Sequence, residues 1–278
     1  MEKHINLNGQ IVEKDSLFLG FDNRAFQYGD SLFETIRVFD GKIPFLEHHV
    51  ERLTSGMFYF GYDFTNEFDE SLIENEIYKL LITNKLKDAR VRLEVFRNSG
   101  GLYTPTQNDF QYIISSQALG SSNFEADSEG LELHISEDIQ LGTSAFQRFK
   151  TGSSMAYIVA GLEKKRNNWE ESILLNSHGR VAETSAGNLF LLKNNTIYTP
   201  SLAEGCIDGV MRKIIIQIAR ERGYSVAITE VSLSFLDTAD EIWVSNAIQG
   251  LKWIKKYKNI TYCNSVFYEI IQQLNVML

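Results

Sequence analysis

The chain has 278 residues, of which 44% are hydrophobic and 23% are charged, and its formal net charge at pH 7 is -9. This length allows a sizeable core in one large or two modest domains, and the acidic balance argues against a general nucleic-acid or anionic-membrane surface. The polar N-terminus and the lack of a long apolar run predict neither a signal peptide nor a membrane span, so we expect a cytoplasmic protein. Cys206 and Cys263 have no metal-ligand spacing, so we expect neither a disulfide framework nor a bound metal.

The first half of the chain alternates strand and helix signals. Asn8-Gly9 is a strong hairpin signal between two short strands. A buried strand is expected over about 32–38, and Pro44 suits the first turn of the helix that follows it. A second amphipathic helix is expected over 67–84, and a strand with alternating apolar and charged side chains is expected over 89–97.

The small polar residues 120–123 form the best linker candidate, because their composition favours neither helix nor strand. We therefore expect an N-terminal α/β domain over 1–119 and a C-terminal domain over 120–278. The expected elements of the second domain are strands at 131–136, 172–175, 188–192, 224–231 and 241–245, a strand that holds Glu183, and helices that follow Lys150, start near Gly209 and close the chain at 266–274.

Two ionisable residues of this second half could form a catalytic pair. Lys150 precedes a helix, and Glu183 lies in a hairpin strand before the small residues 184–187, along which a flat ligand could approach the backbone. A lysine before a helix is usually a solvated cation, and a hairpin glutamate is usually a surface charge. The residues alone therefore leave the catalytic and the surface interpretations open. The helix after Lys150 carries Met155, Ile158, Val159 and Leu162 at helical spacing.

The order of five short motifs goes further. They are His49-Val50-Glu51-Arg52-Leu53, Lys150, the E-x-x-x-x-N run from Glu183 to Asn188 with Leu-Phe after it, Tyr198-Thr199-Pro200, and the G-x-x-x-G-V-x-R run from Gly205 to Arg212. This order resembles the class IV (fold type IV) pyridoxal-phosphate enzymes, which include branched-chain and D-amino-acid aminotransferases and aminodeoxychorismate lyases. The resemblance spans about residues 1–255 and implies a mixed α/β (α+β) fold of two domains, similar to D-amino-acid aminotransferase, in a homodimer.

The resemblance also implies a cofactor, pyridoxal 5'-phosphate, and a role for each matching residue. Lys150 would form a Schiff base with the cofactor and then shuttle the proton of the substrate α-carbon. Glu183 would pair with the pyridine nitrogen and keep it protonated. The residues implied in cofactor binding are Arg52, Glu183, Asn188, Val210, Met211 and Asn246, of which Arg52, the amides of Val210 and Met211, and Asn246 would hold the phosphate.

The substrate pocket is where this chain departs from the family patterns. Met155 replaces a tyrosine common in branched-chain enzymes, and Phe33 replaces a tyrosine of D-amino-acid enzymes. The loop Ser99–Tyr103 keeps the glycines of the lyases, but Leu102 stands where they have an arginine that meets a substrate carboxylate. We therefore expect Phe33, Leu102, Tyr103 and Met155 to line the pocket.

The expected activity is transfer of an amino group between an amino acid and a 2-keto acid. One alternative is aminodeoxychorismate lyase activity, which yields 4-aminobenzoate and pyruvate. A second is a relative that binds the cofactor without catalysis, although the presence of both Lys150 and Glu183 argues against it.

Overall fold

The structure is a computed structural model that describes residues 2–65, 68–120 and 123–278. The chain folds into two compact units, one formed by residues 1–123 and 149–153, the other by residues 124–148 and 154–278. Each unit combines helices with a β-sheet, so the expected mixed α/β fold is confirmed. Glu67, at the expected start of the second helix, and Ser121 and Ser122, in the expected linker, lie outside the described residues.

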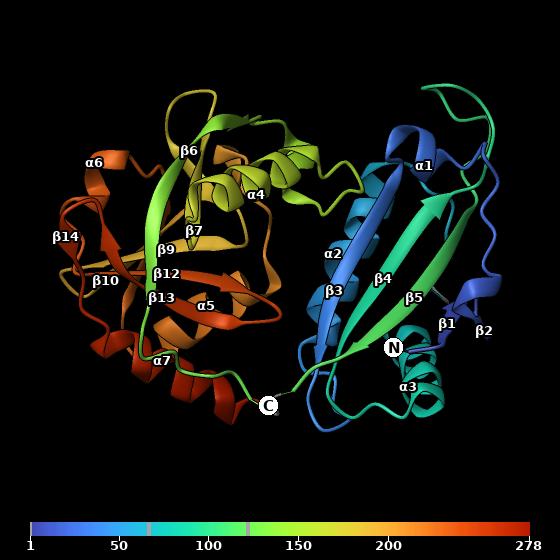
Figure 1. Ribbon diagram of the computed structural model, residues 1–278, viewed down its shortest axis with the longest axis horizontal. Coiled ribbons are helices and arrows are strands. Elements are labelled where there is room, and N and C mark those ends of the chain that lie inside the picture. The colour runs from blue at the N-terminus through green and yellow to red at the C-terminus, as the bar shows by residue number, and fades with distance from the viewer. Residues whose placement is uncertain (1, 66–67, 121–122) are drawn as a thin grey trace. The chain divides into compact units, whose positions relative to one another are not determined.

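The first unit is built on an antiparallel five-stranded sheet in the order β2-β1-β5-β4-β3 (Figure 1). Its strands are β1 (His4–Leu7), β2 (Gln10–Glu13), β3 (Ser31–Val38), β4 (Ala89–Arg97) and β5 (Phe110–Ala118). The hairpin predicted at Asn8-Gly9 is confirmed. Both residues have positive φ, 49° and 86°, as a two-residue turn between twisted strands requires.

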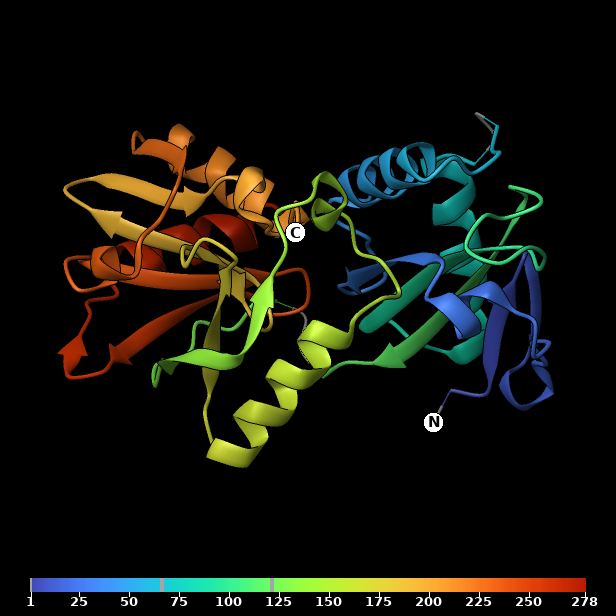
Figure 2. The same cartoon turned by 90° about the horizontal axis from the view of Figure 1, so that it is seen from above.

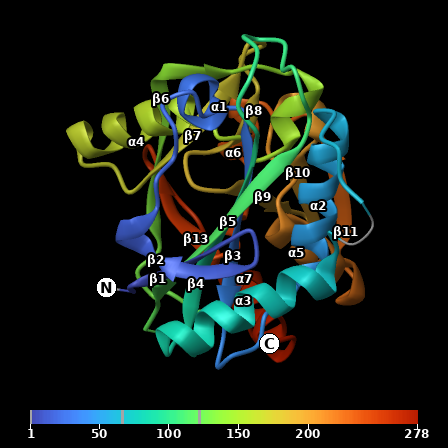
Figure 3. The same cartoon turned by 90° about the vertical axis from the view of Figure 1, so that its right-hand side faces the viewer.

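Two long helices of this unit, α2 (Leu46–Tyr59) and α3 (Glu70–Asn84), cover one face of the sheet (Figure 3). Alternate side chains of β3 and β4, such as Ile36 and Val91, form a single core with them. The helix expected from Pro44 begins two residues later, because Phe45 takes a left-handed conformation with φ of 62°. The shorter helices of this unit are η1 (Lys14–Ser16) and α1 (Arg24–Tyr28).

The second unit contains a mixed sheet in the order β11-β10-β9-β12-β13-β6-β7-β8, with β14 paired to β13. Three of its pairs are parallel, namely β10 with β11, β13 with β6, and β6 with β7. Its strands are β6 (Leu131–Leu141), β7 (Glu171–Asn176), β8 (Val181–Thr184), β9 (Asn188–Lys193), β10 (Thr196–Pro200), β11 (Ser225–Thr229), β12 (Glu241–Asn246), β13 (Gly250–Tyr257) and β14 (Ile260–Thr261).

The helices of the second unit pack on this sheet. α5 (Val210–Glu221) and α7 (Ser265–Val276) contact each other and β12, and Gly209 is the N-cap of α5, close to its predicted start. The remaining helices are η2 (Ala145–Arg148), α4 (Met155–Asn167), η3 (Leu202–Glu204) and α6 (Leu233–Leu236). In the described ranges, no helix is both long and apolar enough to cross a lipid bilayer.

Helix α4 packs on β6 and β7 and can be followed in yellow-green in Figure 2. The apolar side chains that the sequence places at helical spacing lie on its exposed side, since Met155, Ile158 and Leu162 are all more than half exposed. The buried side instead contains Ala160 and Glu163. Apolar periodicity locates this helix, but it does not identify the face that packs on the sheet.

The tight turn between β8 and β9 has a packing requirement of its own. A Cβ atom added to Gly187 would lie 2.1 Å from the backbone oxygen of Ser245 in β12. Besides the approach of a ligand expected for the small residues 184–187, Gly187 makes room for a neighbouring strand. The close approach of two backbones is a common reason for glycine in a strand connection.

We predict that Gly187→Ala lowers the free energy of unfolding by about 2–3 kcal/mol, because the added methyl group must displace the β12 backbone. Urea unfolding followed by circular dichroism measures the change. The matched control is Gly161→Ala on α4, where an added Cβ meets no atom within 4 Å. That variant should gain about 0.5–1 kcal/mol from helix propensity. Equal effects of the two substitutions would contradict the packing explanation.

Candidate active site

Lys150 is held beside strand β3 of the first unit. The Phe33 N–H donates to the Lys150 carbonyl oxygen and the Gly152 N–H donates to the Ser31 carbonyl oxygen, each at 2.9 Å. Leu32 and Thr151 form an antiparallel bridge between these two bonds. The lysine expected before a helix is therefore fixed by strand-like pairing, which gives its backbone a defined position.

The side chain of Lys150 lies over an aromatic ring. Its Nζ is 4.8 Å from the centroid of Phe33, and the Cζ of Arg92 is 3.8 Å from the same centroid. Arg92 also pairs with Glu94 at 2.9 Å. The structure thus brings together Lys150 and Phe33, two predicted site residues, and adds Arg92. The alternation of β4 indicated only that Arg92 points away from the core.

Arg52, the predicted phosphate ligand, binds a buried carboxylate. Its guanidinium donates to both carboxylate oxygens of Glu34 in a bidentate pair, with Nε 2.7 Å from Oε1. His49 Nδ1 lies 2.6 Å from Oε2 of the same carboxylate, and all three side chains are buried. Glu34 therefore orients the guanidinium, and phosphate binding by Arg52 stays a prediction.

The electrostatics of this trio favour a charged Glu34 and a neutral His49. Burial alone would disfavour ionisation of Glu34, but the adjacent Arg52 charge and the His49 hydrogen bond outweigh it and lower the pKa of the carboxyl to about 2. Burial lowers the pKa of His49, although Glu34 opposes this effect. At neutral pH His49 then donates from Nδ1 to the carboxylate, and the Glu34–Arg52 pair has no net charge.

In the second unit, Glu183 is a buried carboxylate held by three hydrogen-bond donors. The Tyr157 hydroxyl donates to Oε1 at 2.5 Å, and Asn188 Nδ2 and the Ile207 N–H donate to Oε2 at 3.3 and 3.2 Å. Asn188 Nδ2 also donates to the Ile207 carbonyl oxygen at 2.8 Å. The structure thus brings the predicted Glu183 and Asn188 together. It adds Tyr157, which comes seven residues after Lys150 and matches none of the motifs.

The N-terminus of α5 lies next to Asn188. A Cβ atom on Gly209 would come within 2.0 Å of the Asn188 Oδ1, so only glycine allows this approach. Val210 and Met211, the predicted phosphate ligands, are the first two residues of α5, and their side chains are buried. Their main-chain N–H groups belong to the first turn of a helix, where backbone donors have no intrahelical acceptor and an anion is favoured.

Ser245 completes this group of polar atoms. It pairs directly with Asn188 across the β9–β12 ladder, so both side chains lie on the same face of the sheet. Its hydroxyl is buried, and within the described residues it has no hydrogen-bond partner. The predicted neighbour Asn246 instead accepts from the N–H groups of Ile248 and Gln249 and so caps the following turn.

This arrangement fits the phosphate of pyridoxal 5'-phosphate. A helix N-terminus with two main-chain donors, an adjacent glycine and a buried hydroxyl without a partner form a donor set that suits a dianion. Ser245 is therefore a further phosphate-ligand candidate. The sequence signal for it was weak, because a serine at the end of a strand is common.

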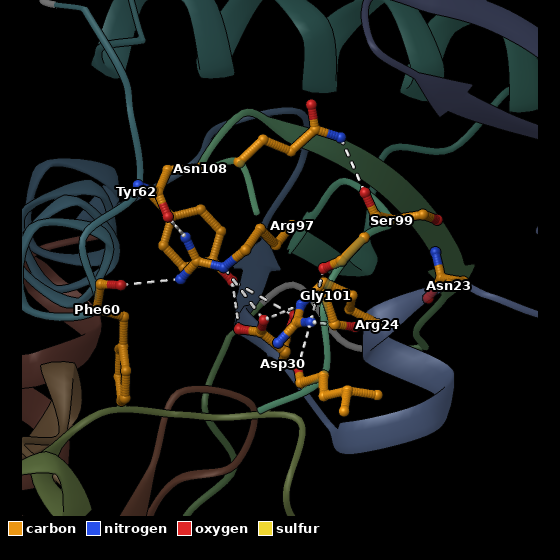
Figure 4. A network of polar contacts seen from close by, with 12 residues as sticks. Asn23, Arg24, Asp30, Phe60, Tyr62, Arg97, Ser99, Gly101 and Asn108 are labelled. Carbon is orange, nitrogen blue, oxygen red and sulfur yellow. Dashed lines mark hydrogen bonds and ion pairs between the residues drawn. The ribbon is translucent and has the colours of Figure 1, made fainter. Parts of the chain in front are cut away.

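A third cluster fixes the loop after β4 within the first unit (Figure 4). Arg24 and Arg97 both bind Oδ2 of Asp30, at 2.8 and 3.1 Å. Arg97 Nη2 also donates to the Phe60 carbonyl oxygen at 2.8 Å, and its guanidinium stacks 4.2 Å from the Tyr62 ring centroid. Two buried arginines therefore share one carboxylate, and backbone carbonyl groups solvate the second positive charge.

Arg24 connects this cluster to the predicted pocket loop. Its Nη1 donates to the carbonyl oxygens of Gly100 and Leu102 at 2.9 and 2.6 Å. The side chains of Leu102 and Tyr103 are 74% and 90% exposed, and the Tyr103 ring lies 5.7 Å from that of Tyr28. The loop backbone is thus held while its two predicted pocket side chains point to solvent.

Comparison with known proteins agrees with the expected family. The family model described as "Amino-transferase class IV" matches residues 31–257. The chain belongs to this family. It is therefore an enzyme, an aminotransferase or a lyase of class IV, and the resemblance inferred from the motifs is confirmed.

Individual relatives include both activities. Aminodeoxychorismate lyase of Bacillus subtilis (strain 168) is 31% identical over 263 residues, which cover 93% of this chain and 88% of the relative. The crystal structure of 4-amino-4-deoxychorismate lyase from Pseudomonas aeruginosa has a TM-score of 0.83 at 25% identity and covers 97% of each chain. A crystal structure of branched-chain amino acid aminotransferase from Escherichia coli has a TM-score of 0.88 at 22% identity, covers 99% of this chain and 94% of the other, and shows the shared fold.

We predict that Glu34 makes stability depend on acid pH. Its pKa falls from 4.5 to about 2 on folding, which is about 3 kcal/mol at about 1.4 kcal/mol per unit. Because the folded-state pKa is depressed, this contribution is complete above pH 4.5 and is lost as the pH falls toward 2. Denaturant unfolding of Glu34→Gln should show a deficit near pH 7 that narrows below pH 4.5. Glu47→Gln, which changes an exposed carboxylate of α2, is the control. A deficit that stays constant with pH would contradict the assignment.

We predict that Arg24→Ala loosens the loop 98–109. Removing the guanidinium leaves the Gly100 and Leu102 carbonyl groups without their donor and should cost about 3 kcal/mol of local stability, or about 100-fold faster amide exchange in the loop. Hydrogen exchange with mass spectrometry measures this locally. Arg166→Ala, which removes an exposed ion pair with Asp138, is the matched control. Unchanged exchange in the loop would show that Arg24 does not hold it.

Proposed function

We propose that this protein is a pyridoxal-phosphate-dependent aminotransferase that moves an amino group between an amino acid and a 2-keto acid. Class IV enzymes use this cofactor, which when bound serves as an electron sink for the substrate α-carbon. The main support is the pairing of Lys150 with the edge of β3, which fixes the attachment point of the one lysine among the family motifs.

Lys150 acts as the covalent attachment residue and then as the proton carrier. With the cofactor bound, the freed Nζ of Lys150 would accept the proton of the substrate α-carbon and later give a proton back. The Phe33 ring beside Nζ restricts the directions in which the amine can move. A defined position for the amine is what proton transfer over a short distance needs.

Glu183 holds the proton at the pyridine nitrogen. Its carboxylate is buried, and its three donors keep it in one orientation, so it offers a fixed negative charge to a cationic ring nitrogen. The amides of Val210 and Met211 and the hydroxyl of Ser245 would bind the phosphate. Arg52 and Asn246 stay sequence-based candidates for the same role.

Arg92 is the candidate for the substrate carboxylate. It shares the Phe33 ring with Lys150, and Glu94 holds its guanidinium in place. One guanidinium beside an aromatic ring suits the α-carboxylate of an amino acid. The lyase substrate carries two carboxylates, and this chain has Leu102 where the lyases have a second arginine.

Aminodeoxychorismate lyase activity is the second candidate. The 31% identity to the Bacillus subtilis lyase over most of both chains favours it, as do the glycines of the loop Ser99–Leu102. Both reactions begin with removal of the same α-proton by Lys150. They would differ afterwards: amino transfer would release a keto acid, whereas the lyase reaction would release pyruvate and 4-aminobenzoate.

We also propose a cytoplasmic homodimer. Phe18, Phe21 and Phe26 lie within nine residues of the first unit and are 87%, 84% and 81% exposed, which is unusual for a monomer in water. A second copy that covers them would remove this apolar surface. Light scattering after size exclusion measures the mass, and a monomer at micromolar concentration would refute the dimer.

The thiols of Cys206 and Cys263 form no disulfide, which suits the reducing cytoplasm.

We predict that the purified protein with pyridoxal 5'-phosphate has a visible absorbance band, and that borohydride fixes the cofactor to Lys150. Lys150→Ala should show neither the adduct nor turnover, with kcat lowered at least about 1,000-fold because the nucleophile and proton carrier are lost. Lys256→Ala, which removes a surface ion pair with Glu132, is the control. An adduct on another lysine would refute the role of Lys150.

The products then decide between the two reactions. L-Leucine, L-glutamate, D-alanine and aminodeoxychorismate are each supplied with 2-oxoglutarate or pyruvate, and keto acid and 4-aminobenzoate are measured. Formation of the keto acid that corresponds to the supplied amino acid supports amino transfer. Production of 4-aminobenzoate without keto acid from any amino acid would replace the first proposal by the second.

A further inference from the structure

Tyr157 forms the shortest of the hydrogen bonds to Glu183 described above. Its hydroxyl lies 2.5 Å from Oε1, within the range of a charge-assisted bond between a hydroxyl and a carboxylate. The residue sits in the first turn of α4 and packs against the apolar cluster of Leu141, Ala160, Leu174 and Ala182. These apolar contacts fix the ring, so the direction of the phenol toward Glu183 is set by the core.

Toward Glu183 the phenol acts as the hydrogen-bond donor. Burial and the neighbouring Glu183 hold the pKa of Tyr157 above its usual range, so the hydroxyl keeps its proton. The nearby thiol of Cys206 also remains protonated, since burial and then Glu183 raise its pKa to about 12. Asp208 and Arg212 are the other charged groups that act on that thiol, and they oppose each other. Of the three hydrogen bonds to Glu183 described above, the one from Tyr157 comes from a hydroxyl.

A donor on a carboxylate stabilises the ionised form and makes the carboxylate a weaker base. If Glu183 shares a proton with the pyridine nitrogen, a less basic carboxylate leaves that proton on the nitrogen. The electron-withdrawing power of the ring depends on that proton. Tyr157 is thus placed where it can influence the reaction without touching the substrate.

We propose that Tyr157 is a positioning residue that holds Glu183 and lowers the basicity of its carboxylate. The proton shared between Glu183 and the cofactor nitrogen would then stay on the nitrogen. This inference rests on the proposed function, because it assumes that Glu183 pairs with that nitrogen. It assigns a role to a residue outside the family motifs and makes α4, which follows Lys150, part of the electronic control of the site.

The first test uses the protein without cofactor. The pKa of Glu183 is measured by infrared titration of its carboxyl band, which Glu183→Gln identifies. Tyr157→Phe should raise this pKa by about one unit, the typical value of a hydrogen bond to a charged group. Tyr224→Phe is the matched control, because it removes a phenol that donates to the carboxylate of Glu269 at 2.9 Å. It should leave the Glu183 titration unchanged.

The second test uses the loaded enzyme with nitrogen-15 in the cofactor ring. In Tyr157→Phe the ring-nitrogen resonance should move toward the unprotonated value and kcat should fall about tenfold, with little change in KM for the keto acid. Incorporation of 3,5-difluorotyrosine at position 157 keeps the ring and strengthens the donor, so it should move the resonance the opposite way. That variant decides the matter if Tyr157→Phe does not fold.

The outcomes separate this inference from the function on which it rests. If wild-type protein shows no bound cofactor, the proposed function fails. If the cofactor binds through Lys150 and Glu183→Gln shifts the ring-nitrogen resonance, but Tyr157→Phe behaves like Tyr224→Phe, the function stands and the role of Tyr157 is refuted. A fall in kcat without a shift in either the Glu183 titration or the ring resonance also refutes it, because a merely structural role would produce that pattern.

Discussion

The cost of burying a carboxylate governs both halves of this protein. An ionised carboxylate without partners costs several kcal/mol in a protein interior, so each one demands donors from elsewhere in the fold. Glu34 in β3 takes a guanidinium and an imidazole from α2, which links a strand to the helix that covers it. Glu183 in β8 takes donors from α4, from β9 and from the segment before α5. These requirements, more than apolar packing, specify where the polar side chains of the site lie.

Within each unit, the same constraint orients charged side chains before any ligand arrives. The Arg52 guanidinium is oriented by Glu34, the Arg92 guanidinium by Glu94, and the Glu183 carboxylate by Tyr157. A charged group that already has its partners loses little side-chain entropy when it binds a ligand, and it is in place when charge develops. Because the Glu34–Arg52 pair is neutral, the proposed phosphate binding would rely mainly on the main-chain dipoles at the start of α5, which suits a protein with a net charge of -9.

The sequence predicts features that depend on a local pattern, but it does not predict contacts between residues that are distant along the chain. Strand β4 was predicted at 89–97 with its observed bounds, because alternation of apolar and charged side chains is a local property. The start of α2 was missed because nothing in the sequence shows that Phe45 takes a left-handed conformation. The motifs predict Lys150 and Glu183 as site residues, whereas they do not indicate Arg92, Tyr157 or Ser245. Each of those three is defined by a neighbour across a sheet or a helix face.

This difference explains why the family could be inferred more easily than the reaction. Lys150 is fixed by backbone pairing and Glu183 by three donors, so chemistry common to the family follows from residues whose geometry is determined within the protein. Leu102, Tyr103 and Met155 are between 66% and 90% exposed, so few contacts within the described residues fix their side chains. Amino transfer and pyruvate elimination share the first proton transfer and differ in the placement of the substrate. The choice between them therefore depends on the part of the protein whose internal contacts constrain it least.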